Sequence, residues 1–165
     1  MVPAAFALFS MYFWTAGLGW GWHIARGRFI AFEGTNVRVP WDMISVSSDD
    51  GKAILMVRHL APYDLFRSPA GSIFVSRGEI ATQKWPTTFD HLVPVYEKPP
   101  NGSHLVHVSK LEFPQRKITC WEFSSTESTF VTIECLSEND ALSASLYGSE
   151  KYRIVLYETL ETVSK

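Results

Sequence analysis

"KITCWEFSSTESTFVTIECLSENDALSASLYG" (residues 117–148) carries the clearest strand pattern in the chain. Apolar and polar residues alternate along three segments of this stretch, as they do in half-buried β-strands. Polar residues 125–128 and 137–140 separate the three segments and include Ser, Asn and Asp, which favour turns. The stretch therefore predicts a meander of three antiparallel strands.

The two cysteines of the chain lie on neighbouring strands of this meander. If Glu127 and Ser128 form the centre of the first turn, Cys120 and Cys135 lie directly opposite each other. Opposed Cβ atoms are about 4.5–5.5 Å apart, and a disulfide needs about 3.5–4.5 Å. A cross-strand disulfide is therefore feasible with a small adjustment, and two reduced core thiols are the alternative.

The residues that follow, 149–163, repeat apolar side chains at helical spacing. Ser149 is a favourable N-cap residue for such a helix. A strand is the alternative, but it would place Glu158 on the same face as apolar residues. The sequence therefore predicts a C-terminal helix whose apolar face carries Tyr152, Val155, Leu156, Leu160 and Val163.

Short alternating runs also occupy the chain upstream of the meander. Residues 28–41 predict one or two short strands broken at residues 34–36, and the next run predicts a hairpin with Asp50-Gly51 in its turn. Residues 87–93 predict a short central helix that Pro94 ends. We therefore expect an α+β fold, in which one domain over residues 29–165 contains an antiparallel sheet packed by a C-terminal helix and a short central helix.

Val39-Pro40-Trp41 leads into the first long hairpin, and "LYGSEKYRIVLYETL" (residues 146–160) joins the last strand to the terminal helix. With the central helix and the meander between them, this order of elements resembles the PsbP/Mog1 α+β domains over residues 30–163. The resemblance implies an accessory or assembly protein without catalytic residues. It rests on the order of elements and not on a motif, so it assigns no functional residue.

The N-terminal stretch from Val2 to Ala25 contains 24 residues and no Asp, Glu, Lys or Arg. A membrane-spanning helix needs about 20 such residues, and apolar side chains on every side of a helix favour lipid. A cleaved signal peptide and a buried helix are the alternatives. We expect residues 1–28 to be a transmembrane anchor with a basic flank, with the membrane interface marked by Trp14, Trp20, Trp22, Arg26 and Arg28.

The anchor also suggests partners and an orientation. The lipid bilayer is the first partner, and small residues at Gly17 and Gly21 predict close packing on a helix of another membrane protein. Arg26 and Arg28 favour a cytoplasmic C-terminal domain, whereas a disulfide favours an oxidising compartment. We expect a single-pass membrane protein whose C-terminal domain lies on the outer, periplasmic or extracellular, face.

The composition argues against a nucleic-acid-binding protein. The chain carries 15 Lys and Arg against 17 Asp and Glu, with a net charge of −2. Its pI is near 6.2, whereas nucleic-acid-binding domains usually have a pI above about 9. We therefore expect no nucleic-acid partner.

The sequence holds no motif for catalysis or metal binding. His104 and His107 would point to opposite faces of a strand, so they would not share a metal ion. We expect no catalytic, cofactor or metal residue, and we favour a membrane-tethered, non-catalytic accessory, assembly or binding module. The alternatives are a structural subunit of a membrane complex, or a membrane-bound hydrolase or metal enzyme whose site gathers distant residues such as His59, His91 and His104.

Overall fold

The fold is mostly β-sheet. The structure, a computed structural model, describes residues 17, 19–48, 50–58, 71–78, 106–113, 117–125, 130–137 and 141–164, without the side chains of residues 106–108, 110, 125 and 130. The strands in this part of the chain are β1 (Phe29–Phe32), β2 (Thr35–Arg38), β3 (Met43–Ser47), β4 (Ala53–Arg58), β5 (Gly71–Arg77), β6 (Val106–Phe113), β7 (Ile118–Ser125), β8 (Phe130–Ser137) and β9 (Leu142–Ser149). The helical elements are residues 19–26, the 3-10 helix η2 (Glu150–Tyr152) and α4 (Arg153–Val163).

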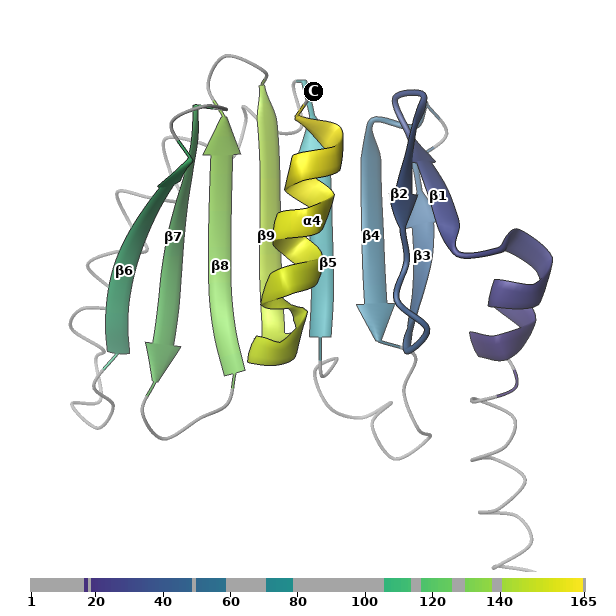
Figure 1. Cartoon of the computed structure of the whole chain (residues 1–165), viewed down its shortest axis with the longest axis horizontal. Coiled ribbons are helices and arrows are strands. Elements are labelled where there is room, and N and C mark those ends of the chain that lie inside the picture. Colours follow the sequence, from purple (N-terminus) through teal and green to yellow (C-terminus); the bar gives the residue numbers. More distant parts are fainter. Residues whose placement is uncertain are drawn as a thin grey trace, which may run out of the picture.

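Seven strands form one antiparallel sheet in the order β3-β4-β5-β9-β8-β7-β6 (Figure 1). The predicted meander is its β7-β8-β9 part, and the hairpin with Asp50-Gly51 in its turn is β3-β4. The pairing of β5 with β9 joins these two halves, although the two strands are far apart in the sequence. Because this contact is non-local, no turn signal in the sequence predicts it.

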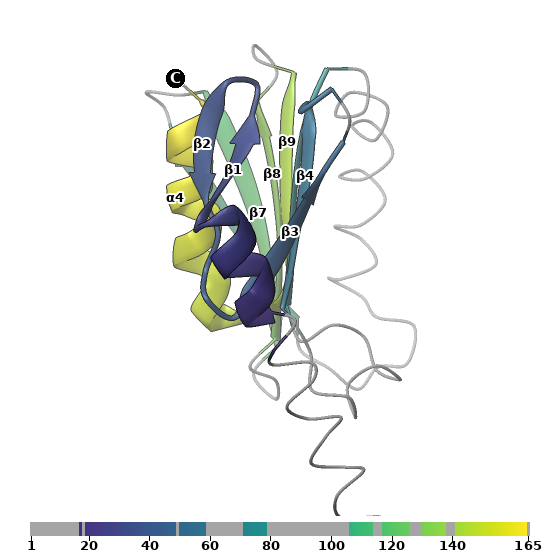
Figure 2. The ribbon, with the colours of Figure 1, turned by 90° about the vertical axis from the view of Figure 1, so that its right-hand side faces the viewer.

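One face of the sheet forms the core. Ile54, Val75, Ala144 and Cys135 form one row of directly paired residues across β4, β5, β9 and β8, and all are buried. Residues at alternate positions of a strand share a face, so these strands contribute every second side chain to the core. Figure 2 shows α4 and the β1-β2 hairpin together on one side of this sheet.

The β1-β2 hairpin packs its apolar side chains into the same core, where Phe32 and Val37 are buried. Its turn consists of Glu33 and Gly34, which have φ angles of 46° and 79°. Positive φ at both central residues is typical of the tight turn that matches the twist of two antiparallel strands. The sequence predicted the break between the two strands at residues 34–36. The turn lies one residue earlier, at Glu33 and Gly34.

Helix α4 covers the middle of the sheet with Leu156, Leu160 and Val163, which are all buried. Their spacing of four and three residues places them on one helical face. Ser149 makes no side-chain capping hydrogen bond, because the chain enters α4 through η2 rather than directly from the strand. At the other end, Arg77 of β5 donates a hydrogen bond of 2.6 Å to the Val163 carbonyl oxygen.

The disulfide is present. Cys120 of β7 and Cys135 of β8 are paired residues in the sheet register, their Cα atoms are 4.0 Å apart, and a disulfide joins them. The two side chains are buried in the core. The sequence-based register is confirmed, and the alternative of two reduced thiols is wrong.

The predicted fold class is wrong in its N-terminal transmembrane helix. The helix at residues 19–26 is short and not apolar, and no helix in the described ranges is long and apolar enough to cross a membrane. Gly27, with a φ of 73°, ends this helix, and its N–H donates to the His23 carbonyl oxygen over 2.8 Å. The fold is predominantly β, and not the expected α+β fold with a membrane anchor. The short central helix predicted at residues 87–93 lies outside the described residues.

The helix at residues 19–26 packs on protein. His23 is buried, and its Nε2 lies 2.8 Å from the carbonyl oxygen of Met43. The ring of Trp22 also packs against the core cluster. The sequence pattern suggested lipid because it lacked charges, but hydrogen bonding by His23 and packing by Trp22 attach this segment to the sheet.

Candidate functional site

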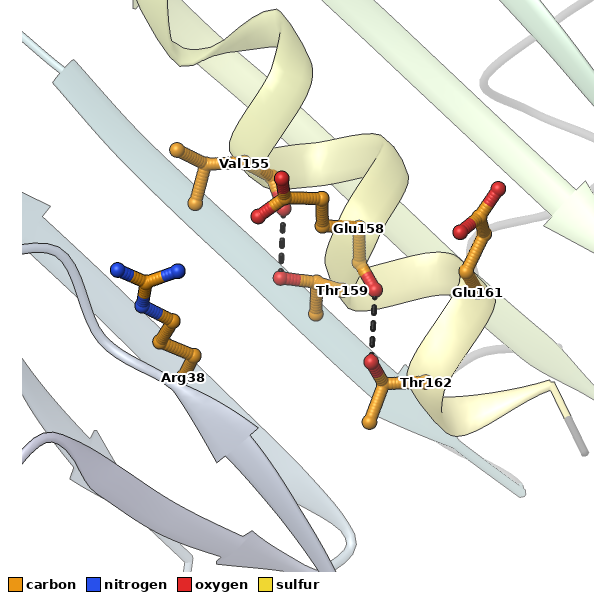
Figure 3. Close-up of a pocket in the computed structure, with 6 residues that line it drawn as sticks. All are labelled: Arg38, Val155, Glu158, Thr159, Glu161 and Thr162. Atoms are coloured by element: carbon orange, nitrogen blue, oxygen red, sulfur yellow. Dashed lines mark hydrogen bonds between the residues drawn. The ribbon is translucent and has the colours of Figure 1, made fainter.

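A polar groove lies between β2 and the C-terminal half of α4, with a volume of about 290 Å³ (Figure 3). Arg38 lines the side of β2, and the opposite side is formed by residues of α4. Figure 3 shows the Arg38 side chain directed toward the helix and the Glu158 carboxylate extending toward it, while Glu161 points away. The residues of α4 that line the groove are Val155, Glu158, Thr159, Glu161 and Thr162.

Local structure explains why these side chains line the same groove. Arg38 is the exposed residue that follows buried Val37 in the alternating pattern of β2. Glu158 and Thr162 are four residues apart on α4, so they lie on the same face of the helix. Because α4 and the hairpin cover the same side of the sheet, their exposed edges form the two walls.

The helical wall presents hydrogen-bond acceptors. The Thr159 hydroxyl donates to the Val155 carbonyl oxygen over 2.7 Å, and the Thr162 hydroxyl donates to the Glu158 carbonyl oxygen over 2.8 Å. A hydroxyl has one proton and two lone pairs, so both oxygens retain acceptor capacity only. The carboxylate of Glu158 adds a negatively charged acceptor to this wall.

The opposite wall presents a donor. The Arg38 guanidinium carries N–H donors and no acceptor. No described ion pair or hydrogen bond engages this guanidinium or the Glu158 carboxylate. The groove is therefore polarised, with a cationic donor on the hairpin and anionic acceptors on the helix.

The helix itself reinforces this polarity. Glu158 and Glu161 lie in the last two turns of α4, and its last turn contains no basic residue. The C-terminal end of a helix carries a partial negative charge, so acidic residues there are electrostatically unfavourable unless a cation lies nearby. Arg77 satisfies the Val163 carbonyl oxygen from the sheet side, which leaves the groove side of α4 acidic.

The lining of the groove is suited to binding a polar group through charges and hydrogen bonds. No His, Cys or Lys is among its lining residues. Its two hydroxyl protons are committed to backbone carbonyl oxygens of the helix. A nucleophilic hydroxyl gives its proton to an adjacent base, whereas both threonine hydroxyls here donate to backbone carbonyl oxygens.

A second charged cluster anchors η2 to the start of β3. Lys151 and Tyr152 donate hydrogen bonds of 2.6 and 2.8 Å to the same carboxylate oxygen of Asp42. Burial alone would raise the pKa of Asp42, but these two hydrogen bonds together with the positive charge of Lys151 and a backbone hydrogen bond hold the pKa below its usual 3.8. Burial raises the pKa of Tyr152, which therefore stays protonated as a donor. Both donors, Lys151 and Tyr152, therefore find their acceptor, Asp42, within the cluster itself.

A third cluster lies between α4 and β7. Arg153 forms ion pairs with Glu122 and with Glu150, and the Tyr157 hydroxyl lies buried without a hydrogen-bond partner. Burial and the Glu122 charge raise the pKa of Tyr157 against the opposing effect of Arg153. The arrangement holds α4 on the sheet, and its charges are already paired.

The structure describes four of the five residues predicted for the membrane interface, and their role at an interface stays a prediction. Trp20 is 68% exposed and Arg26 is exposed, whereas Trp22 packs on the core. The Arg28 guanidinium lies 4.9 Å from the centre of the Trp41 ring, in cation–π geometry. The membrane location, the single-pass topology and the outer-face orientation predicted from the sequence are not supported, because no helix among the described residues is long and apolar enough to span a bilayer. Trp14 lies outside the described residues.

The remaining predictions concern two glycines as a helix contact and several histidines as possible site residues. A Cβ built at Gly17 or Gly21 would meet no atom within 4 Å, and their contact with a partner helix stays a prediction. His59, His91 and His104 lie outside the described residues, as does the side chain of His107. Among the residues that the structure describes, no group of three His, Cys, Asp or Glu side chains could hold a metal ion.

Sequence reasoning missed the groove. Arg38 and Glu158 are far apart in the chain, and each alone is an ordinary exposed charge. One signal was available: acidic residues at the C-terminal end of a helix break a local electrostatic rule, and such breaks are common at functional sites. Comparisons with protein-family models, with curated proteins and with solved structures found no significant match.

Proposed function

We propose that this protein is a non-catalytic binding module whose ligand site is the groove between β2 and α4. The single observation that carries the proposal is the pair Arg38 and Glu158, two opposite charges that line one cavity without forming an ion pair. Exposed charges of opposite sign often pair on a protein surface. Here the groove separates them and leaves both available to a ligand.

The size of the groove restricts the ligand. Ligand pockets usually measure about 300–1,000 Å³ and are mostly apolar. This groove, of about 290 Å³, is at the lower limit and is lined by polar side chains except for Val155. The ligand is therefore small and polar.

The proposal agrees with the accessory role that the resemblance to PsbP/Mog1 domains implies. That resemblance stays a prediction, because it rests on the order of elements and includes a central helix outside the described residues. The membrane tether expected from the sequence is not part of the proposal.

The test is a titration of the ¹⁵N-labelled full chain with four probe mixtures: carboxylic acids, amines, zwitterionic amino acids and polyols. We expect at least one mixture to shift the amide signals of Arg38 and of residues 155–162, and the probes to remain chemically unchanged over hours. Shifts confined to other regions, or conversion of a probe into a product, would contradict a non-catalytic module that uses this groove.

A further inference from the structure

We infer that the groove between β2 and α4 takes a small zwitterion, a molecule that carries a carboxylate and an ammonium group separated by a short aliphatic chain. This inference rests on the proposed binding function and specifies its ligand class. It follows from the distribution of hydrogen-bond donors and acceptors over the two walls. Each wall is complementary to a different charged group of the ligand.

The hairpin wall demands an anion. The Arg38 guanidinium is permanently charged and presents planar, paired N–H groups, a geometry that matches a carboxylate with two parallel hydrogen bonds. Arg38 is exposed at the end of β2, and Phe29, its partner in the hairpin register, supplies no charge. A carboxylate on the ligand would supply the acceptor that Arg38 lacks.

The helical wall demands a cation with hydrogen-bond donors. Thr162 offers only lone pairs, because its proton binds the helix backbone, and the buried Thr159 hydroxyl is held in the same way. Glu158 adds a full negative charge to this wall. An ammonium group has three donors and no acceptor, so it fits this wall, whereas a second carboxylate would be repelled.

Between the two walls, Val155 supplies an apolar contact. A short methylene chain between the ligand charges would lie against it and bury a small apolar area. A dication, a dianion and a neutral polyol each leave at least one wall without a complementary charge. The zwitterion alone among these classes matches both walls at once.

The matched probes are 4-aminobutyrate, butyrate and butylammonium, which share a carbon chain and differ in their charges. With the full chain, we expect 4-aminobutyrate to bind at least about tenfold more tightly than either singly charged analogue, as measured by amide shifts at the groove. Glycine and 5-aminovalerate test the spacing between the charges. Added salt should weaken binding, because the contacts are ionic and partly exposed.

Two variants test the assignment of the walls. In Arg38→Gln, 4-aminobutyrate should bind no better than butylammonium, and in Glu158→Gln it should bind no better than butyrate. This crossed pattern cannot arise from general loss of structure, and unchanged amide shifts outside the groove confirm folding. Arg26→Gln is the matched control, because Arg26 is exposed on the helix at residues 19–26, and it should leave binding unchanged.

The outcomes separate the two proposals. If butyrate, butylammonium or glycerol shifts the groove amides as strongly as 4-aminobutyrate, the zwitterion is wrong and the binding module stands. If no probe shifts these amides at tens of millimolar, both proposals are overturned. If the zwitterion binds but Arg38→Gln and Glu158→Gln bind it as wild type does, binding occurs elsewhere and the inference is overturned.

Discussion

At the scale of single residues, Gly71 holds a position that no larger residue can occupy. A Cβ at Gly71 would overlap the ring of Tyr152, which is buried beside β5. Close contact between this glycine and the tyrosine ring is what lets the Tyr152 hydroxyl reach Asp42. The first residue of β5 must therefore be small, because the Tyr152 ring occupies the space of a Cβ.

We predict that Gly71→Ala lowers the free energy of unfolding by about 1–3 kcal/mol, as overpacking in a well-filled core does. Urea denaturation followed by fluorescence measures it. Gly21→Ala is the control, because a Cβ there meets no atom and alanine favours the helix. Equal stability of the Gly71→Ala variant and wild type would mean that Tyr152 does not pack on this glycine.

Asp42 gives a pH-dependent prediction. Its pKa is lowered in the folded protein, so it stabilises the fold above its unfolded pKa of about 3.8, and this stabilisation disappears as the pH falls through the lower folded value. The expected contribution is below about 1 kcal/mol, because the carboxyl is 41% exposed and screened by solvent.

The measurement compares wild type with Asp42→Asn by urea denaturation between pH 7 and pH 2.5. The stability gap should be constant near neutral pH and should close as the carboxyl of the wild type becomes protonated. A gap that widens toward low pH would contradict the ionised, hydrogen-bonded carboxylate.

At the scale of elements, the disulfide ties β7 to β8. Cys120 and Cys135 are 15 residues apart, and closing a loop of this length in the unfolded chain is worth about 3 kcal/mol. We predict that the variant with Cys120→Ala and Cys135→Ala loses about 2–4 kcal/mol of unfolding free energy in denaturant titrations.

Reduced wild type is the control for this loss, because it lacks the loop constraint but leaves no cavity in the core. It should fall between oxidised wild type and the alanine variant. If the thiols of unreduced wild type react with an alkylating reagent under denaturing conditions, the bond between β7 and β8 is absent.

Arg77 joins three elements at the C-terminal end of α4. Its guanidinium donates to the Val163 carbonyl oxygen, pairs with Glu33 over 2.9 Å and lies over the ring of Phe32. We predict that Arg77→Ala destabilises the protein by about 1–3 kcal/mol and accelerates hydrogen exchange at the last-turn amides of α4.

Arg58→Ala is the matched control for Arg77. Arg58 ends β4 and forms no ion pair within the described part of the chain. It should leave both the stability and the exchange of the α4 amides close to wild type. Equal effects of the two variants would mean that Arg77 does not cap the helix.

For the molecule as a whole, local sequence patterns predicted the strands and turns that depend on neighbouring residues. They did not predict features that depend on contacts between residues far apart in the chain. The alternation of residues 117–148 predicted β7, β8 and β9, and the count from Glu127 and Ser128 placed the two cysteines opposite each other. The N-terminal prediction assigned residues 19–25 to a membrane span because a run without charges does not reveal that His23 will hydrogen-bond to the Met43 carbonyl oxygen.

The groove could not be predicted for the same reason. Arg38 and Glu158 line the same groove because β5 pairs with β9 and because the β1-β2 hairpin docks beside α4. Neither contact leaves a periodic signal in the sequence. The site therefore belongs to the tertiary structure, and its chemistry becomes visible only when both walls are in place.

A crystal structure of the full chain grown with 4-aminobutyrate would show directly whether the groove between β2 and α4 binds a zwitterion. We expect density for the ligand between these two elements, with its carboxylate on the Arg38 guanidinium and its ammonium group within hydrogen-bond distance of Glu158. Ligand bound in the reverse orientation or at another surface, or a groove without ligand at saturating concentration, would contradict a zwitterion site in this groove.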